Sequence, residues 1–136
     1  MLTPHQARRA LMSLRTAVGW SSMVMPRLTL RIFGVNAAEQ PGLVYVLRLF
    51  GIRDILMAYQ LYQAQTIHSK AEEMEEALRQ GMAVDGIDTL SALVAGARGN
   101  ISARTAAMGA GTAALAAAIG YMGRDAAGPS PAERNS

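Results

Sequence analysis

Five ionisable residues stand inside two otherwise apolar stretches and are the strongest candidates for chemistry in this sequence. The stretch VLRLFGIRDILMAY carries Arg48, Arg53 and Asp54, and the stretch AVDGIDTLSALVAG carries Asp85 and Asp88. A pair of carboxylates could do general acid–base work if burial tuned one of them to the reaction. Inside a membrane, charged residues of this kind also mark the path of a substrate or an ion. The simpler interpretation is a network of ion pairs that fixes the register of neighbouring helices.

The spacing of these charges limits which of them can meet. Asp85 and Asp88 are three residues apart, so they share one face of a helix. Arg48 and Arg53 are five residues apart, roughly 140° around a helix, so they point towards different neighbours. We expect Arg53 to reach the helix of the two aspartates, with Asp88 as its partner. Arg48 is expected to face another helix or the surface.

Asp54 projects roughly a further 100° around the helix, and its partner is left open among Arg15, Arg27 and Arg31. On the membrane-insertion scale, each Arg or Asp at a helix centre costs roughly 2.5–3.5 kcal/mol, whereas each Leu, Ile, Val or Phe returns only about 0.3–0.6 kcal/mol. The three charges of VLRLFGIRDILMAY therefore outweigh its apolar residues if the segment inserts alone. We expect them to find partners or water inside the folded chain.

Four apolar segments must position these charges. No strand-like alternation persists anywhere in the chain, so each segment is predicted to be helical. The expected fold is all-α, a four-helix transmembrane bundle that forms one domain over residues 1–123. The Pro-, Ser- and Gly-rich residues 124–136 are predicted to be a disordered C-terminal tail. The apolar segments are residues 10–25, 43–61, 82–97 and 105–123.

A polar helical linker, KAEEMEEALRQ, is expected between the second and third helices. Ser69 and Glu72 have the spacing of a capping box at its start, and Gly81 is expected to end it. Its glutamates are most simply a solvated face. Pro26 is expected to interrupt the first segment, and Pro41 is well placed as the first residue of the second helix.

The last segment carries the membrane prediction, because a membrane span needs about 20 predominantly apolar residues. No charged residue occurs between Arg104 and Arg124, which could anchor the two ends of a span. Gly109, Ala113 and Ala117 recur every four residues and predict a small-residue face for close helix packing. In a soluble helical bundle, which is the alternative, the charges would lie on exposed faces.

Composition removes several classes of function. The chain is 51% hydrophobic and 17% charged, and it has no cysteine, which excludes disulfides, thiolate zinc sites and a cysteine nucleophile. Its basic residues are dispersed rather than clustered, so nucleic acid is not an expected partner. The two histidines, His5 and His68, are not placed to hold a haem. We expect no catalytic residue, metal or cofactor, and the sequence leans against an enzyme.

The basic residues suggest an orientation, because cytoplasmic loops of membrane proteins are rich in Lys and Arg. The expected location is the cell membrane, crossed several times, with both termini cytoplasmic. The lipid bilayer is then the main partner, and a homo-oligomer or a larger membrane complex is compatible with the sequence. The cytoplasmic side would carry Arg8, Arg9, Lys70, Arg79, Arg124 and Arg134, against Arg27, Arg31, Arg98 and Arg104 outside.

The segments RLFGIRDILMAY and AVDGIDTLSALVAG together resemble a family of uncharacterised small four-helix integral membrane proteins of actinobacteria, distantly similar to DoxX-like proteins. The shared pattern is Arg48, Gly51, Arg53 and Asp54 followed by an Asp-x-x-Asp segment, and the resemblance covers roughly residues 10–123. It implies a membrane location and a four-helix fold, and it implies no established activity.

Three functions compete on this evidence. The first is a non-catalytic accessory or structural component of the cell envelope, favoured by the small size and the close-packing faces. The second is a small-molecule or ion binding or transport protein that uses the intramembrane Arg/Asp cluster. A membrane oxidoreductase ranks last because no redox ligand is available. Dry, mutually paired charges would favour the first function, and charges that line an open cleft would favour the second.

Overall fold

The computed structural model describes residues 1–68 and 70–125, and this part of the chain is helical without any strand. The prediction of an all-α protein is confirmed. The described chain has five α-helices and one π-helical turn, η1, where four apolar segments were predicted. The additional helix is α2, which begins at Pro26, directly after the first predicted segment. The elements are α1 (Pro4–Val24), α2 (Pro26–Ile32), α3 (Gly42–Tyr62), η1 (Gln63–His68), α4 (Ala71–Ala97) and α5 (Ala103–Met122).

Local sequence signals account for most of the helix ends. Thr3 and Gln6 form a capping box at the start of α1, in which each side chain bonds to the backbone N–H of the other residue. Gly34 after α2 and Gly99 after α4 have positive φ angles of 81° and 72°. The following N–H groups bond back to carbonyls near each helix end, as in a Schellman motif, which requires this left-handed residue.

The prediction of a separate polar linker is wrong in one respect. The polar residues 71–80 are the first three turns of α4, which continues through Gly81 without a break to Ala97. Gly81 is buried, and a Cβ atom on it would lie 2.8 Å from Nη2 of Arg15. The glycine is thus a place where another helix comes close, rather than a helix end. Ser69, the expected cap, lies outside the described residues, and Lys70 is the N-cap.

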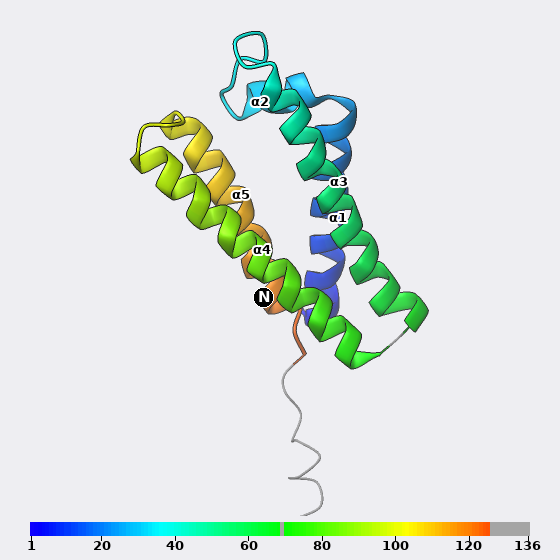
Figure 1. Ribbon diagram of the computed structural model, residues 1–136. Helices are drawn as coiled ribbons and strands as arrows, with labels where there is room; N and C mark the ends of the chain where they lie inside the picture. The colour runs from blue at the N-terminus through cyan, green and yellow to red at the C-terminus, as the bar shows by residue number, and fades with distance from the viewer. Residues whose placement is uncertain (69, 126–136) are drawn as a thin grey trace, which may run out of the picture.

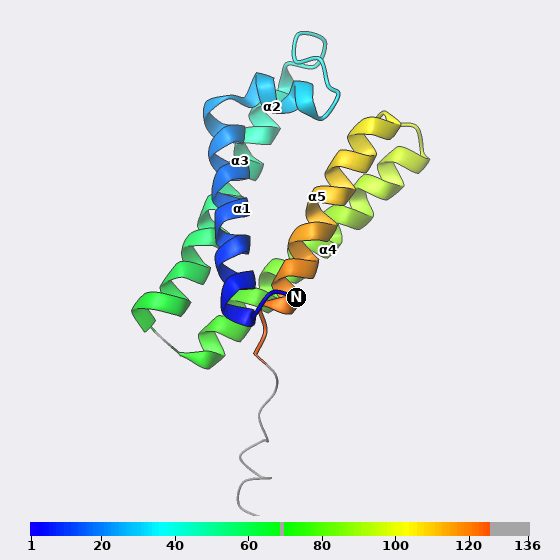
Figure 2. The same ribbon diagram turned by 180° about the vertical axis from the view of Figure 1, so that it is seen from behind.

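The helices form two antiparallel hairpins, α1 with α3 and α4 with α5 (Figures 1 and 2). The hairpins meet at the end that holds the N-terminus and diverge towards α2 and the α4–α5 turn. At this far end, Nη2 of Arg104 donates to the Ile32 carbonyl (3.1 Å), and Oγ1 of Thr105 donates to the Phe33 carbonyl (2.8 Å). These bonds link α5 to the carbonyls that the end of α2 leaves free.

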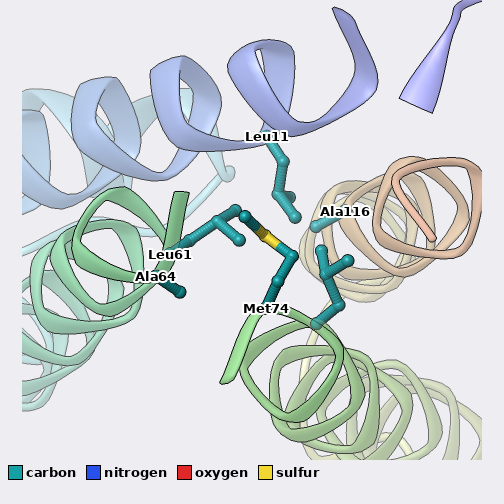
Figure 3. Close-up of a cluster of buried hydrophobic side chains, with 6 residues drawn as sticks. Leu11, Leu61, Ala64, Met74 and Ala116 are labelled. Atoms are coloured by element: carbon teal, nitrogen blue, oxygen red, sulfur yellow. The ribbon is translucent and has the colours of Figure 1, made fainter. Parts of the chain in front are cut away.

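A small apolar core joins the hairpins where they meet (Figure 3). It draws one or two side chains from each of α1, α3, η1, α4 and α5, so the ends of both hairpins are fixed to each other. Outside this cluster, many large apolar side chains are exposed, and the described chain has few buried ones. The buried members are Leu11, Leu61, Ala64, Met74, Leu78 and Ala116.

Helices α1 and α3 approach each other closely at Gly19 and Gly51. A Cβ atom on Gly51 would lie 2.6 Å from the backbone oxygen of Gly19, and one on Gly19 would lie 2.7 Å from Cγ1 of Ile55. Small residues of this kind let two helix backbones touch. The crossing of α1 and α3 therefore depends on glycine at both positions.

One helix of the described chain, α5, is long and apolar enough to cross a membrane. Its mean hydropathy is 1.3, and only 28% of the spanning window is buried inside the protein, whereas the core helix of a soluble protein would be mostly buried. Helix α3 is as long, but Arg48, Arg53 and Asp54 fall within any stretch of it that is long enough to span. Length and composition thus support one span rather than four.

Replacing Gly51 with alanine should lower the free energy of unfolding by about 1–3 kcal/mol, because the new methyl group meets a backbone oxygen that cannot move aside. The matched control is Gly86→Ala in the middle of α4, where nothing beyond the neighbouring residues and the backbone of α4 itself lies within 4 Å of the new Cβ. That change should raise stability by up to about 1 kcal/mol through helix propensity. Thermal unfolding followed by circular dichroism measures both, and equal effects would contradict the close crossing.

Candidate functional site

The charged residues lie next to the apolar core, on the faces that the two hairpins turn towards each other. Arg15 follows Leu11 by four residues on α1, and Asp85 follows Leu78 by seven on α4, so each charge continues a core-facing stripe. On α3, Asp54 precedes Leu61 by seven residues, roughly 10 Å along the helix. A charged layer therefore lies next to the apolar layer, towards the end where the hairpins diverge.

The most buried ion pair joins Arg15 to Asp85. Nη2 of Arg15 lies 2.6 Å from Oδ2 of Asp85, and the side chains are only 4% and 6% exposed. Nη1 of Arg15 also donates to Sδ of Met57 on α3 at 3.1 Å. The guanidinium lies against Gly81, where any side chain would displace it. One arginine thus contacts α3 and α4 from α1 and connects the two hairpins through a charge-assisted hydrogen bond.

The second ion pair joins Arg53 to Asp88 across the gap between α3 and α4. Nη1 and Nη2 of Arg53 donate to the two carboxylate oxygens at 3.3 and 2.6 Å, in a bidentate arrangement. The guanidinium also stacks over the ring of Phe50, 4.7 Å from its centroid. Asp54 is placed less tightly, with Oδ1 3.6 Å from Nη2 of Arg53. This pair is more open than the first, because Arg53 and Asp88 are 33% and 27% exposed.

These charges form part of the wall of a cavity of about 520 Å³ between the hairpins. A cavity of this size suits a small organic molecule. Apart from the five charged residues, its wall is apolar with a few hydroxyl groups. The lining is Leu14, Arg15, Val18, Ser22, Phe33, Leu47, Phe50, Arg53, Asp54, Asp85, Asp88, Ser91, Ala92, Ala95, Ile101, Gly109, Thr112, Ala113 and Ala116.

The structure brings together four of the five charged residues singled out by the sequence. Arg53, Asp54, Asp85 and Asp88 line the cavity, whereas Arg48 is exposed on the outer face of α3. Of the three arginines left open as partners of Asp54, Arg15 acts on it through its charge, while the ion pair of Asp54 is with the adjacent Arg53. The arginine at 15 pairs with Asp85 instead, and those at 27 and 31 lie on the surface of α2.

Arg15 belongs to the charged cluster, although the sequence pattern names it only as one possible partner of Asp54. It stands alone in the apolar stretch ALMSLRTAVGW, so no neighbouring charge marks it as part of a cluster. The signal that identifies it is its helical spacing from Leu11, which places it on the buried stripe of α1. A lone charge on the core-facing side of an apolar helix predicts a buried partner, because an unpaired buried charge is very costly.

The predicted small face of α5 borders the cavity and is not the closest contact of that helix. Gly109 and Ala113 line the cavity, and a Cβ on Gly109 would make only ordinary contact with Ala92, at 3.5 Å. Ala117 is half-buried. The tightest approach of α4 and α5 is at Gly96, where an added Cβ would lie 2.5 Å from that of Ala106.

Exposed ion pairs hold the two ends of the described chain together. Arg8 pairs with Asp125 at 3.2 Å, and Nε of Arg124 donates to Oε1 of Glu75 at 2.6 Å. The hydrogen bond and the charge of Glu75 raise the pKa of the Arg124 guanidinium above its ordinary value. Arg124 and Asp125, expected in the tail, are therefore attached to α4 and α1. Residues 126–136 lie outside the described chain, and within it no cluster of three acidic or histidine side chains could hold a metal ion.

Replacing Arg15 or Asp85 alone with leucine should lower the free energy of unfolding by about 3–5 kcal/mol, because each change leaves an unpaired buried charge. The double variant should regain most of that loss. The control is the exposed pair of Arg79 and Glu76, whose removal should change stability by less than about 1 kcal/mol. Chemical unfolding of the purified variants measures all of these, and additive losses in the double variant would contradict the pairing.

Comparisons with models of protein families, with curated proteins and with solved structures find no match to this chain. The resemblance to small actinobacterial membrane proteins therefore stays a prediction, and the function must be argued from the site itself.

Proposed function

We propose that this chain is a multi-pass membrane protein whose helices α1, α3, α4 and α5 cross the bilayer and enclose a binding cavity for a small molecule. The distribution of side chains supports the membrane location. Large apolar side chains lie outside and paired charges lie inside, whereas a soluble bundle has the opposite arrangement. Leu49, Ile52 and Leu56 form an exposed apolar stripe on α3. Ile87 and Leu90 begin a second stripe on α4. The paired charges lie inside, where charges within a membrane protein are normally found.

The aromatic residues support the same arrangement. The single Trp and all four Tyr are exposed, and each lies near a helix end. Trp20 and Tyr45 lie near the end that holds α2, and Tyr59, Tyr62 and Tyr121 lie near the end that holds the N-terminus. Trp and Tyr concentrate in this way at the two membrane–water interfaces. Tyr45 and Tyr62 are roughly 26 Å apart along α3, close to the thickness of a bilayer core of about 30 Å.

The basic residues support an orientation with both termini in the cytoplasm. Arg8, Arg9, Lys70, Arg79 and Arg124 belong to the end where the N-terminus and Asp125 meet. Four arginines belong to the other end, so the excess of positive charge is small. Arg48 lies about 9 Å along α3 from Gly42, within reach of that far interface for a long side chain that extends outwards.

Single cysteine variants test the membrane arrangement, because the natural sequence contains no cysteine. In sealed, oriented vesicles, a membrane-impermeant maleimide should label Gln40→Cys from one side and Glu72→Cys from the other. Leu56→Cys, in the apolar stripe of α3, should react only after the protein is denatured. Labelling of the first two from the same side would contradict the multi-pass arrangement. Recovery of the protein in the soluble fraction after a carbonate wash would favour a soluble bundle.

The cavity carries the functional part of the proposal. Small-molecule sites are concave, mostly apolar, and contain a few placed polar groups. Here the apolar wall is completed by Arg53, Asp54 and Asp88, which are partly open to the cavity. This observation favours a binding or transport protein over a purely structural one.

A non-catalytic accessory component of the envelope is the second candidate, and the buried Arg15–Asp85 pair favours it. This pair is nearly inaccessible and holds the two hairpins in register. In a structural protein, the paired charges need no role beyond fixing how the helices pack. The two candidates differ in whether the cavity takes up a molecule.

Filling the cavity tests the binding function. A neutral, apolar dye whose fluorescence rises in dry surroundings should bind to the purified protein in detergent and lose at least half of its signal with Ala113→Leu. The control is Ala114→Leu, the same change at the next position on α5, which is exposed and outside the cavity wall. Equal dye binding by both variants, each folded by circular dichroism, would favour the structural candidate.

A further inference from the structure

The cavity wall carries an excess of negative charge. Two arginines face three aspartates across it, so the ionised wall has one carboxylate more than it has cations. Guanidinium groups stay protonated in proteins, so the arginines cannot adjust this balance. A positively charged ligand in the cavity would neutralise this excess negative charge.

The hydrogen bonds show which carboxylate is left over. Arg15 is committed to Asp85 at 2.6 Å, and Arg53 is committed to Asp88 through both of its terminal nitrogens. Among the described residues, Asp54 has a looser contact with Arg53, at 3.6 Å, and Arg15 attracts it through its charge without a short hydrogen bond. Asp54 is therefore the acceptor of the cavity wall with the most unused capacity, since a carboxylate accepts several hydrogen bonds.

We propose that the ligand of this cavity is an organic cation with an apolar body, such as a hydrophobic ammonium compound, and that Asp54 is its counter-ion. This inference rests on the proposed binding function and names its ligand class. The leucine, valine, phenylalanine and alanine side chains of the wall match the apolar body, and the surplus carboxylate matches the positive charge.

Two other ligand classes fit the wall less well. An anion would need a free cationic donor, but both guanidinium groups are paired, and Nε of Arg53 is buried where a ligand cannot reach it. A bare metal ion would need several oxygen or nitrogen ligands around one point, and the described residues hold no such group. The mainly apolar wall favours an organic molecule over both.

The test compares tetraphenylphosphonium with tetraphenylborate, which have nearly the same shape and opposite charges. Each ion is added to the purified full-length protein with bound dye in detergent, and the loss of dye fluorescence is followed. The fluorescence change measured with Ala113→Leu protein is subtracted, because it reports partition into micelles rather than binding in the cavity. We expect tetraphenylphosphonium to displace the dye at a concentration about tenfold lower than tetraphenylborate. Asp54→Asn should weaken the binding of the cation by about tenfold or more relative to that of the neutral dye.

Two further variants make the result decisive. Asp54→Glu keeps the charge and should keep the preference for the cation. Asp125→Asn, the same chemical change outside the cavity, should alter nothing, and it identifies any effect of net charge alone. Equal displacement of the dye by both ions would overturn this inference, and it is the result expected if Asp54 carries a proton. Unchanged cation binding by folded Asp54→Asn protein would overturn it as well. Failure of the dye itself to bind to the natural protein would instead overturn the proposed binding function.

Discussion

The ion pair between Arg15 and Asp85 constrains the rest of this structure. Two charges that are almost fully removed from water must face each other closely, because either one alone would be very costly. That requirement fixes α1 against α4 and so ties one helix hairpin to the other. It also explains the glycine at 81, since only a residue without a side chain leaves room for the guanidinium. The small apolar core holds the same end of the hairpins and could not by itself dictate their register.

The distribution of polarity follows from the same constraint. The charges of the cavity wall lie on the inner faces of the helices, and large apolar side chains are exposed on α3 and α4. This arrangement is favourable in a bilayer, because lipid contacts the apolar outer surface and the paired charges are kept away from the lipid. The hairpins diverge beyond the ion pairs, which leaves the cavity, and Asp54 lies in its wall. We propose that the carboxylate of Asp54 makes this cavity select cations. Membrane location and ligand class are thus proposals that share one physical origin.

The candidate site was only partly predictable. Asp85 and Asp88 could be placed on one face, because their spacing fixes their relative direction on any helix. The partner of Asp54 could not be predicted, because three arginines lay within reach and the choice depends on how α1 and α3 cross. That crossing is set by the contact of Gly19 with Gly51, whose closeness depends on two segments that are far apart in the sequence. The role of Arg15 in the buried ion pair could not be predicted for a related reason, because its partner, Asp85, lies seventy residues away in the sequence.

The sequence by itself determined the helical class, the break at Pro26 and the apolar character of the last helix, because these depend on periodicity, on proline chemistry and on composition over short windows. It also determined that the charges of α3 needed partners. Only the tertiary structure decided which partners these are, that Gly81 lies inside a helix, that Arg48 faces outwards, and that a cavity exists between the hairpins. Those features depend on the relative position of distant helices, and that position is fixed by close contacts and buried charges which no local pattern encodes.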